Sequence, residues 1–315
     1  MPEPGPTQVV VRIEAVGICG SDVHYYETGR IGKYVVEAPM VVGHESAGTV
    51  VAVGTSVSKE RIGQQVALES GVPDGTCEQC RAGRYNLCPD VTFFATPPVD
   101  GSIAEFVAIE ESFAHPVPAG LTAEQAALAE PVSVGVWACQ KAAVKPGDRV
   151  LVTGTGPVGL LSAQVARAFG ATRVTLTDVN ARRLDVARGL GFEALPAGAE
   201  QGRGFDVLIE CSGSPSATAA AIESLAPAAR VVLVGMGSGE LVLPLQAVQN
   251  NELTITGIFR YANTYPLALQ LLASGAVRSD VIITHRFDLV DTERALRLAH
   301  SDPESLKAIV TPCPA

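Results

Sequence analysis

Two different patterns of apolar and polar positions divide the chain. Before about residue 115 the apolar runs are short, contain alternating polar positions, and are separated by glycine and proline. They are Val9–Ile13, Ala47–Val53, Gln65–Leu68 and Ile103–Ala108. Short alternating runs bounded by turn residues are typical of β-strands. The first third of the chain is therefore predicted to form an all-β domain.

From about Pro131 onward, strand-like runs alternate with segments of helical spacing. Strands are expected at Arg149–Thr153, Arg173–Asp178, Phe205–Cys211 and Arg230–Gly235, and helices at Val158–Phe169, Arg182–Leu190 and Ser216–Leu225. This alternation predicts βαβ units and a parallel sheet. In the tail we expect a helix at Tyr265–Ala273, a strand at Val281–Phe287 and an amphipathic helix at Glu293–His300. The predicted fold class is α/β, with a β domain beside a doubly wound parallel sheet.

The segment Gly154–Gly159 fits the pattern G-x-G-x-x-G and follows a predicted strand. In a dinucleotide-binding turn the glycines allow the turn, the approach of a pyrophosphate, and close packing of helix on strand. Asp178 ends the next strand, about 20 residues on, where a carboxylate accepts hydrogen bonds from the adenosine ribose. NAD is therefore favoured over NADP, although Asp178 would also cap a helix, and Arg182 and Arg183 follow closely. The candidate cofactor residues are Gly154, Gly156, Pro157, Val158, Gly159, Asp178 and Arg183.

Composition and charge narrow the possible functions. Hydrophobic residues make up 47% of the 315 residues, which is enough for two cores. The net charge of −10 disfavours nucleic acid and anionic lipid as partners, because like charges repel. The apolar runs are too short to span a bilayer, and residues 1–6 show no signal-peptide pattern, so we expect a cytoplasmic protein.

The seven cysteines point to metal binding. An odd number without a secretion signal argues against a disulfide framework. Cys19 lies in a glycine-rich segment, and His44 and Glu45 follow in a second one. A thiolate, an imidazole and a carboxylate are the three protein ligands of many catalytic zinc sites. Singly, Cys19 or His44 is more often a buried structural residue; jointly they favour a catalytic zinc.

A second group of candidate ligands has the spacing Asp74-x2-Cys77-x2-Cys80-x7-Cys88. Aspartate can bind zinc through oxygen, but it is a harder ligand than thiolate, so such a site is expected to hold the metal less tightly than four thiolates. Both a filled and an empty site are compatible with the sequence. The remaining histidines and cysteines lack metal spacing: we expect His115 and His300 to be solvated, His285 to be structural, and Cys139, Cys211 and Cys313 to be core or surface thiols.

Gly17–His24 together with Gly43–Glu45 resembles the zinc-containing medium-chain dehydrogenases. Further motifs narrow the resemblance to the sorbitol/xylitol (polyol) dehydrogenase branch: Val23–Tyr26, Gly83–Leu87, Phe93–Pro98, Glu130–Gly135 and Phe259–Tyr261. The resemblance implies a GroES-like catalytic domain from residues 1–132 and 259–315, and a Rossmann NAD-binding domain at 133–258. It also implies an N-terminal hairpin ahead of Met1, so we expect a version extended upstream to be more stable and more active.

The resemblance also implies roles for individual residues. Glu130 is either a further zinc ligand or acts through a water molecule, and Ser21 and His24 relay protons or contact the nicotinamide ribose. It places Asp74 where the family has the first of four structural-zinc cysteines. The implied substrate-binding residues are Tyr25, Phe94, Thr96, Arg260 and Tyr261. Plain aromatic packing is an equally good explanation of Tyr25 and Phe94, whereas the charge of Arg260 in an apolar run calls for a partner.

The expected function is zinc-dependent oxidation of a polyol secondary alcohol to the ketose, with hydride transfer to NAD in the crevice between the domains. Two alternatives stay open. One is another zinc medium-chain dehydrogenase, acting on threonine, a simple alcohol or a sugar acid. The other is a catalytically silent NAD-binding protein. The resemblance further implies a homo-oligomer, either a tetramer or a dimer.

Overall fold

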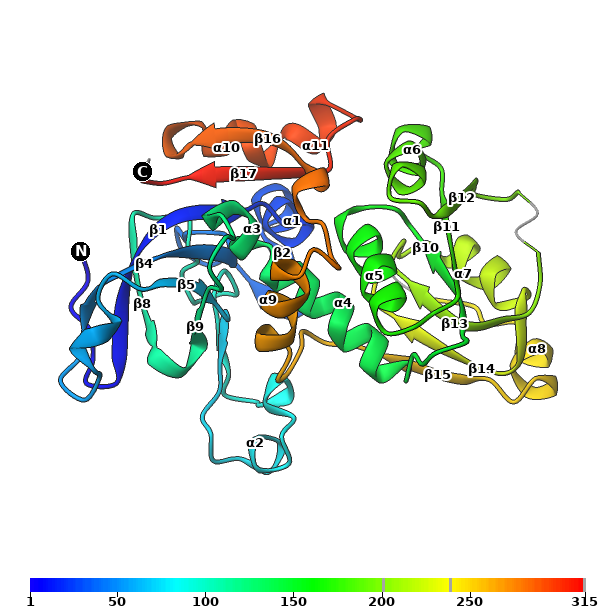
Figure 1. The fold of residues 1–315 in the computed structure, drawn as a ribbon, viewed down its shortest axis with the longest axis horizontal. Helices are drawn as coiled ribbons and strands as arrows, with labels where there is room; N and C mark the ends of the chain where they lie inside the picture. Colours follow the sequence, from blue (N-terminus) through cyan, green and yellow to red (C-terminus); the bar gives the residue numbers. More distant parts are fainter. Residues whose placement is uncertain (200–201, 238–239, 314–315) are drawn as a thin grey trace. The chain divides into compact units, whose positions relative to one another are not determined.

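The computed structural model describes residues 1–199, 202–237 and 240–313, and the chain divides into two compact units (Figure 1). Unit 1 contains Met1–Glu130, Tyr265–Ala273 and the chain from Ser279 onward, and unit 2 contains Pro131–Thr264 and Ser274–Arg278. Unit 1 is therefore built from both ends of the chain. Both candidate metal sites fall in unit 1, and the glycine-rich loop falls in unit 2.

Unit 1 is organised around a seven-stranded sheet with the order β16-β17-β1-β4-β5-β9, and β8 also pairs with β1. The strands are β1 (Gln8–Gly17), β4 (Glu45–Val53), β5 (Gln65–Leu68), β8 (Phe106–Glu110), β9 (Ala114–Pro116), β16 (Ile283–Asp288) and β17 (Lys307–Thr311). All pairs are antiparallel except β16 with β17. Because β17 lies beside β1, the last strand of the chain pairs with the first. This pairing brings distant parts of the sequence to one place.

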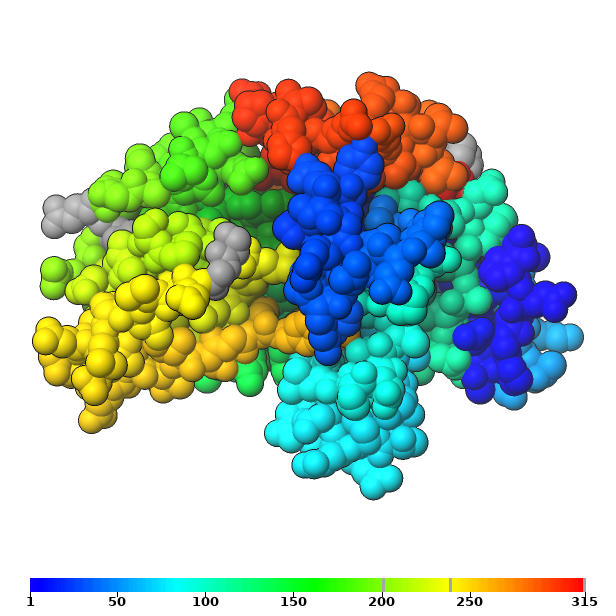
Figure 2. All heavy atoms as spheres, turned by 180° about the vertical axis from the view of Figure 1, so that it is seen from behind, coloured from blue at the N-terminus to red at the C-terminus, as the bar shows by residue number. Residues whose placement is uncertain are grey.

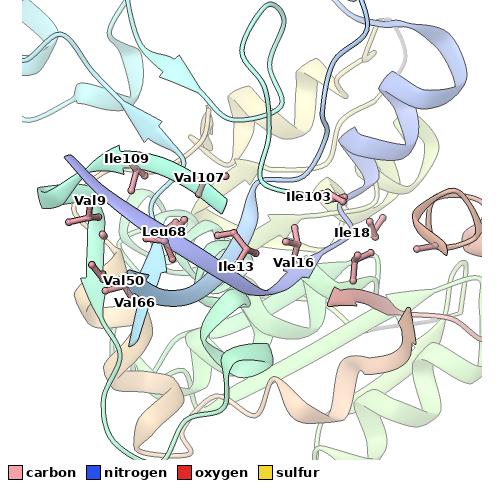
Figure 3. Close-up of a cluster of buried hydrophobic side chains, with 14 of the residues drawn as sticks. Val9, Ile13, Val16, Ile18, Val50, Val66, Leu68, Ile103, Val107 and Ile109 are labelled. Carbon is pink, nitrogen blue, oxygen red and sulfur yellow. The ribbon is translucent and has the colours of Figure 1, made fainter. Parts of the chain in front are cut away.

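The core of unit 1 is an apolar cluster built on β1 (Figure 3). Val9, Ile13 and Val16 of β1 are fully buried, and the cluster also takes in Leu68 of β5 and Ile109 of β8. Burying one such side chain contributes about 1.5–3 kcal/mol. The predicted β texture of the first third of the chain is confirmed, and the cluster fixes the strand ends that carry the candidate metal ligands.

A helix follows β1 where the sequence suggested only glycine-rich turns. Helix α1 (Gly20–Thr28) begins after Cys19, whose backbone N–H donates to Oδ2 of Asp22 at 2.9 Å. An acidic side chain that reaches back to the first orphan N–H of a helix is a capping interaction. Gly29, with a φ of 69°, ends the helix by donating its N–H to the carbonyl of Tyr25. The spacing Cys19-x-x-Asp22 was the local signal for this helix.

Unit 2 contains a six-stranded sheet in which every neighbouring pair is parallel, with the order β12-β11-β10-β13-β14-β15. The strands are β10 (Arg149–Thr153), β11 (Arg173–Asp178), β12 (Glu193–Pro196), β13 (Phe205–Glu210), β14 (Leu225–Leu233) and β15 (Thr254–Gly257). The connecting helices include α5 (Pro157–Ala168), α6 (Ala181–Gly189) and α7 (Pro215–Ile222). This strand order, 3-2-1-4-5-6, is that of a dinucleotide-binding fold. The predicted βαβ pattern is confirmed.

The remaining elements are short or peripheral. They are β2 (Arg30–Ile31), β3 (Tyr34–Val35), β6 (Gly71–Val72), β7 (Thr92–Phe93), α2 (Glu78–Arg81), α3 (Ala123–Ala127), α4 (Ala129–Lys141), α8 (Leu245–Asn250), α9 (Tyr265–Ala273), α10 (Thr292–Leu296), α11 (Leu298–Ser301), and the 3-10 helices Lys59–Arg61, Tyr85–Leu87, Glu111–Phe113, Asp280–Ile282 and Leu289–Asp291. The single helix expected near the C-terminus is two helices, because Arg297 (ψ −4°) interrupts it. Across the described ranges, no helix is both long enough and apolar enough to cross a membrane.

Candidate metal and dinucleotide sites

Cys19, His44 and Glu45 come together in unit 1, as the sequence predicts. Their ligand atoms all lie within 4.8 Å of one another. Cys19 precedes α1, His44 directly precedes β4, and Glu45 is the first residue of β4. The side chains of His44 and Glu45 are buried, whereas Cys19 is half-buried. Strand pairing is the cause of this geometry, because Gly17 at the end of β1 lies opposite Glu45.

The glycine at position 17 makes room for the Glu45 carboxylate. A Cβ atom placed on Gly17 would lie 2.1 Å from Oε2 of Glu45, which is far inside van der Waals contact. Any larger residue would therefore push the carboxylate away from its position. The carboxylate is held over the backbone of β1 by the register of the sheet.

Asp22 lies behind His44 and orients it. Oδ1 of Asp22 is 3.4 Å from Nδ1 of His44 and accepts the N–H of Gly43 at 2.8 Å, and the side chain is completely buried. Burial raises the pKa of Asp22, but its contacts with His44 and with the N–H groups of Cys19 and Gly43 outweigh burial, so the pKa is below its ordinary value. A carboxylate that faces one imidazole nitrogen leaves the other nitrogen to ligate a metal. Nε2 of His44 is therefore the nitrogen available for this role.

The charge around His44 favours a cation. Burial lowers the pKa of His44, but the charges of Asp22 and Cys19 raise it and outweigh burial, so the pKa lies well above its ordinary value. A zinc ion bound by a neutral imidazole would place positive charge beside these groups. The donor set of sulfur, nitrogen and oxygen fits Zn²⁺.

Lys307, in the first position of β17, is a member of the site that the sequence reading missed. Its Nζ donates to both carboxylate oxygens of Glu45, at 2.7 and 2.8 Å, and to the carbonyl of Ile18 at 2.9 Å. The side chain is buried. Burial lowers the pKa of Lys307, but the charges of Glu45 and Cys19 raise it and outweigh burial, so the pKa is above its ordinary value. The sequence signal was available: a lone lysine in an apolar run calls for a partner, as Arg260 does.

The other candidate residues of unit 1 are spread over three segments. Ser21, His24 and Tyr25 lie on α1, where Ser21 is half-buried, His24 is exposed and Tyr25 is buried. Glu130 is buried in the first turn of α4, and its charge acts on Lys307, so it belongs to the electrostatic surroundings of the cluster.

Phe94 and Thr96 follow β7. Phe94 packs partly buried against the apolar cluster of unit 1, and Thr96 is half-buried and pairs in a short bridge with Val99. Phe93, next to Phe94, lies with its ring centroid 5.8 Å from that of His44. This segment therefore lies near the candidate zinc ligand His44. Packing against the apolar cluster explains why Phe94 is partly buried.

The second predicted cluster also comes together. Asp74, Cys77, Cys80 and Cys88 have their ligand atoms within 4.8 Å of one another, in a lobe that stands out from unit 1 (Figure 2). Oδ1 of Asp74 accepts the N–H groups of Thr76 and Cys77, at 2.7 and 3.0 Å, and lies 3.3 Å from the sulfur of Cys80. Asp74 therefore has a turn-capping role of its own. Because a carboxylate has about four acceptor positions, this does not prevent it from binding a metal.

The thiols of this lobe differ in acidity. The N–H of Cys80 donates to the sulfur of Cys77 and lowers the pKa of Cys77 below its ordinary value. Burial and hydrogen bonds to Cys77 and Asp74 raise the pKa of Cys80 to about 12. The pKa of Asp74 is lowered to about 2 by the N–H groups of Cys77 and Thr76. Asp74 is thus ionised at neutral pH, as a ligand must be.

His115 is not the solvated surface group expected from its proline-rich surroundings. It lies on β9 with its Nε2 2.7 Å from Oε2 of the buried Glu69, and its ring stacks on that of Tyr265 at 5.0 Å. Oε1 of Glu69 accepts the hydroxyl of Tyr85 at 2.5 Å. The physical reason is the buried carboxylate, which needs donors. Tyr85 lies between Cys80 and Cys88, so this network ties the metal lobe to the main sheet.

The glycine-rich loop of unit 2 is shaped for a dinucleotide. Gly154 has a φ of 83°, and a Cβ atom on Gly159 would lie 1.9 Å from the carbonyl oxygen of Gly154, so helix and turn pack closely only with glycine. At Gly156 the nearest atom to such a Cβ would be 4.0 Å away, on Arg183, which leaves open space above the backbone. Pro157 is the first residue of α5 and Val158 follows it. An open backbone at a helix N-terminus is suited to a pyrophosphate.

Asp178 at the end of β11 lies against this loop. Its Oδ2 accepts the N–H of Thr155 at 2.5 Å, and its Oδ1 accepts the N–H of Asn180 at 2.8 Å. Asp178 therefore supports the loop as well as occupying the position expected of a ribose acceptor. The side chain of Asn180, and not that of Asp178, caps α6 by accepting the N–H of Arg183.

Arg260 and Tyr261 belong to unit 2, on the segment after β15. Arg260 is half-buried, has a φ of 56° and lies with its guanidinium 4.7 Å from the centroid of the Phe259 ring. Tyr261 is buried. A left-handed backbone at a non-glycine residue costs free energy and is concentrated at functional segments. The roles of both residues stay predictions.

Comparisons with known proteins place the chain in a family. The description "alcohol dehydrogenase GroES-like domain" matches residues 5–119, and "zinc-binding dehydrogenase" matches residues 157–274. The sorbitol dehydrogenase of Bacillus subtilis (strain 168) is 42% identical over 325 aligned positions, covering 99% of this chain and 92% of that protein. The sorbitol dehydrogenase of Homo sapiens is 43% identical over 309 positions, covering 94% of this chain and 86% of that protein.

A solved structure agrees with these sequence relationships. An oxidoreductase/dehydrogenase of unknown specificity from Escherichia coli superposes with a TM-score of 0.93 at 34% identity, covering 99% of this chain and 93% of that chain. The chain belongs to the zinc-binding alcohol dehydrogenase family. Within this family it belongs to the polyol dehydrogenase branch.

Membership of this family confirms several predictions. The fold class is the expected α/β combination of a GroES-like domain and a dinucleotide-binding sheet. The expected cofactors, Zn²⁺ and NAD, are those that the zinc-binding dehydrogenase family implies, and the cluster of Cys19, His44 and Glu45 provides suitable zinc ligands. The roles of the individual site residues remain predictions.

Proposed function

We propose that this protein oxidises a secondary alcohol of a polyol, such as sorbitol or xylitol, to the ketose, with hydride transfer to NAD. The single observation that carries the proposal is the convergence of Cys19, His44 and Glu45 within 4.8 Å, in a chain of the zinc-binding dehydrogenase family. A sulfur, a ring nitrogen and a carboxylate are the donors of a catalytic zinc site that keeps one position open.

Each residue of unit 1 has a distinct task in this proposal. Bound zinc supplies Lewis-acid chemistry toward the alcohol oxygen. Cys19, His44 and Glu45 hold the ion, and Asp22 fixes the imidazole of His44 through the 3.4 Å contact at Nδ1. Glu130 is buried, and its charge acts on Lys307 beside the candidate ligands. In this proposal it takes part in proton removal from the alcohol.

Ser21 and His24 form a second proton path in this proposal. Both lie on α1, directly after Cys19, so the helix that presents the thiolate also presents the hydroxyl and the imidazole. His24 is exposed and can therefore exchange a proton with solvent. General acid–base groups of this kind contribute typically about 10²–10⁴-fold to a rate.

Unit 2 binds the NAD in this proposal. The N-terminus of α5 offers backbone N–H groups to the pyrophosphate, and Gly156 leaves the space for it. The Asp178 carboxylate accepts the adenosine ribose hydroxyls and repels a 2′-phosphate, while Arg183 lies beside the loop. Bound NAD would supply the redox chemistry as the hydride acceptor, and these residues of unit 2 would hold it in place.

Substrate binding is assigned to five side chains, namely Tyr25, Phe94, Thr96, Arg260 and Tyr261. Tyr25, Phe94 and Thr96 belong to unit 1, and Arg260 and Tyr261 to unit 2. Aromatic faces suit the carbon skeleton of a sugar alcohol, and a guanidinium suits its hydroxyl oxygens. Arg260→Ala should raise the KM for the polyol more than the KM for NAD.

We also propose that the protein is a homo-oligomer, a dimer or a tetramer. The strand β15 is at the edge of the six-stranded sheet, and Thr254 and Gly257 in it are exposed. Nearby in the sequence, Val242 and Leu245 are 80% and 65% exposed. An exposed edge strand is a template for pairing with another chain. Light scattering after size exclusion tests this proposal, and a monomer at micromolar concentration would contradict it.

The activity itself is tested by NADH formation with a panel of alcohols: sorbitol, xylitol, ribitol, threonine and ethanol. The proposal predicts turnover with at least one polyol, weaker turnover with threonine and ethanol, and loss of turnover on zinc removal. Turnover with threonine or ethanol alone would assign the protein to a different substrate class. NAD binding without any turnover in the zinc-loaded protein would favour the silent NAD-binding alternative.

A further inference from the structure

Lys307 and Glu45 form a buried ion pair inside the candidate zinc site. The ammonium group donates to both oxygens of the carboxylate, at 2.7 and 2.8 Å, so the lysine holds the whole carboxylate group. The third donor bond of Lys307 goes to the carbonyl of Ile18, the residue before Cys19. The lysine is therefore fixed on both sides by the two segments that carry the three candidate ligands.

The same carboxylate is required by two cations. Zinc binding by Glu45 needs electron pairs of the oxygens that Lys307 also binds. A carboxylate shared with an ammonium group donates less charge to a metal than one that is not shared, and a buried positive charge a few ångströms away opposes the arrival of a dication. Lys307 therefore acts against tight binding of zinc through Glu45.

Stability alone is a poor explanation of this lysine. A buried ion pair is often no more stabilising than apolar residues of the same volume, because both charges lose their hydration. Position 307 follows Leu306 and precedes Ala308 and Ile309 in an apolar run, where an apolar residue would complete the strand without this cost. The lysine instead places its charge directly on a candidate metal ligand.

We propose that Lys307 is a positioning residue of the zinc centre, which holds the Glu45 carboxylate in place and weakens it as a zinc ligand. As a result Cys19 and His44 carry most of the metal binding, and the ion keeps more positive charge for the alcohol. The inference rests on the proposed zinc centre, which it deepens by assigning this task to a residue outside the ligand set.

The test is the zinc affinity of Lys307→Gln, measured by competition with a chromogenic chelator. The zinc that belongs to this site is the fraction lost in Cys19→Ser, which separates it from any zinc in the lobe of Asp74 and Cys77. Glutamine keeps hydrogen-bond donors for Glu45 but removes the charge. We expect the zinc Kd of Lys307→Gln to fall at least about tenfold, because the Glu45 carboxylate no longer shares its charge with an ammonium group and attracts the ion more strongly. An unchanged or higher Kd would overturn the proposal.

A second arm repeats the substitution with Glu45→Gln already present. If Lys307 acts through the carboxylate, Lys307→Gln changes the zinc affinity less in this background than in the wild type. An equal change in both backgrounds would contradict that route. The double variant leaves neither charge of the pair without its partner. If Lys307→Gln alone does not fold, the zinc affinity of the double variant is therefore compared with that of Glu45→Gln alone.

Two further variants complete the design. Lys307→Arg keeps the charge and binds a carboxylate through two N–H groups, so its zinc Kd should equal or exceed that of the wild type; tighter zinc binding would contradict the proposal. Arg61→Gln is the matched control, since Arg61 is a largely buried cation of unit 1 that pairs with Glu111 and with backbone carbonyls. It should leave the zinc affinity unchanged, and a tenfold change in it would show that loss of any buried cation gives the effect.

The outcomes also separate this inference from the proposed function. A wild-type protein without Cys19-dependent zinc would contradict both. A wild-type protein that binds zinc, with Lys307→Gln at the same Kd, would contradict this inference alone. Co²⁺ in place of zinc gives an independent measurement, because its visible spectrum reports the ligands and should change in Lys307→Gln more than in Arg61→Gln.

Discussion

Nδ1 of His44 lies 3.4 Å from Oδ1 of Asp22, a carboxylate with no exposed surface. Asn in place of Asp22 would lack the charge and would present an N–H₂ group toward one of its present donors. We predict that Asp22→Asn weakens zinc binding by about 10–100-fold, the usual cost of losing such a partner. Chelator competition measures the change.

The matched control for this prediction is Asp100→Asn. Asp100 is exposed, and its Oδ1 accepts the N–H of Val41 at 2.8 Å, so the same chemical change is made away from the ligands. Its zinc Kd should stay within about twofold of the wild type, as for surface substitutions that touch no special feature. Equal zinc affinities of Asp22→Asn and the wild type would show that Asp22 does not orient His44.

Asp74 is the oxygen donor in a cluster that otherwise consists of thiols. We predict that Asp74→Cys raises the zinc content retained by the lobe after dialysis against a weak chelator, because thiolate is the softer ligand. Metal analysis per chain measures the effect. Asp90→Cys, which adds a cysteine just beyond Cys88 but outside the cluster, should not raise it. If both variants retain the same zinc as the wild type, Asp74 does not limit the site.

The two neighbouring thiols Cys77 and Cys80 should react at different pH values in the zinc-free protein. The thiolate forms as the pH rises through the pKa, and the pKa of Cys77 is lowered while that of Cys80 is about 12. At about pH 8, iodoacetamide should therefore modify Cys77 first, since the thiolate is the nucleophile. Peptide mapping by mass spectrometry identifies the modified residue, and zinc should protect both. Preferential modification of Cys80 would contradict the hydrogen-bond pattern of the lobe.

Alanine at two glycines of the dinucleotide loop should affect two different properties, NAD binding at one position and stability at the other. In Gly156→Ala the added methyl group meets no atom closer than 4.0 Å, so the fold should be unaffected while NAD binding weakens, because the methyl occupies the space of the pyrophosphate. In Gly159→Ala the methyl would lie 1.9 Å from the Gly154 carbonyl oxygen, so the protein should lose about 1–3 kcal/mol of stability. Thermal unfolding and an NAD titration distinguish the two variants. Wild-type NAD affinity in Gly156→Ala would contradict the placement of the cofactor.

Local sequence patterns were sufficient for much of the fold and of the site. The glycine spacing of the loop and the cysteine spacing of the lobe are set by the chemistry of turns and ligands, so they can be recognised in a few residues. The parallel sheet was predicted because strand-like runs alternate with segments of helical spacing. The helix after Cys19 was obscured by the glycines at and around its ends, although Asp22 stands at the capping position.

Interactions between distant segments were not predictable in this way. Lys307 and Glu45 are 262 positions apart and meet only because β17 pairs with β1 and β4 begins opposite Gly17. His115 was assigned to the surface because its proline neighbours suggest a loop, whereas its Nε2 lies 2.7 Å from the buried carboxylate of Glu69, directly after β5. For Lys307 the lone charge in an apolar run indicated that a partner exists, and strand pairing determined which partner it was.

The most direct test of the central claim is polyol-dependent NADH formation before and after removal of zinc, in the wild type and in Cys19→Ser. We predict that the wild type loses its activity with chelator and recovers it with added Zn²⁺, and that Cys19→Ser stays inactive with zinc although it binds NAD. Full activity of the zinc-free wild type, or of Cys19→Ser, would contradict the assignment of Cys19, His44 and Glu45 as the catalytic zinc site.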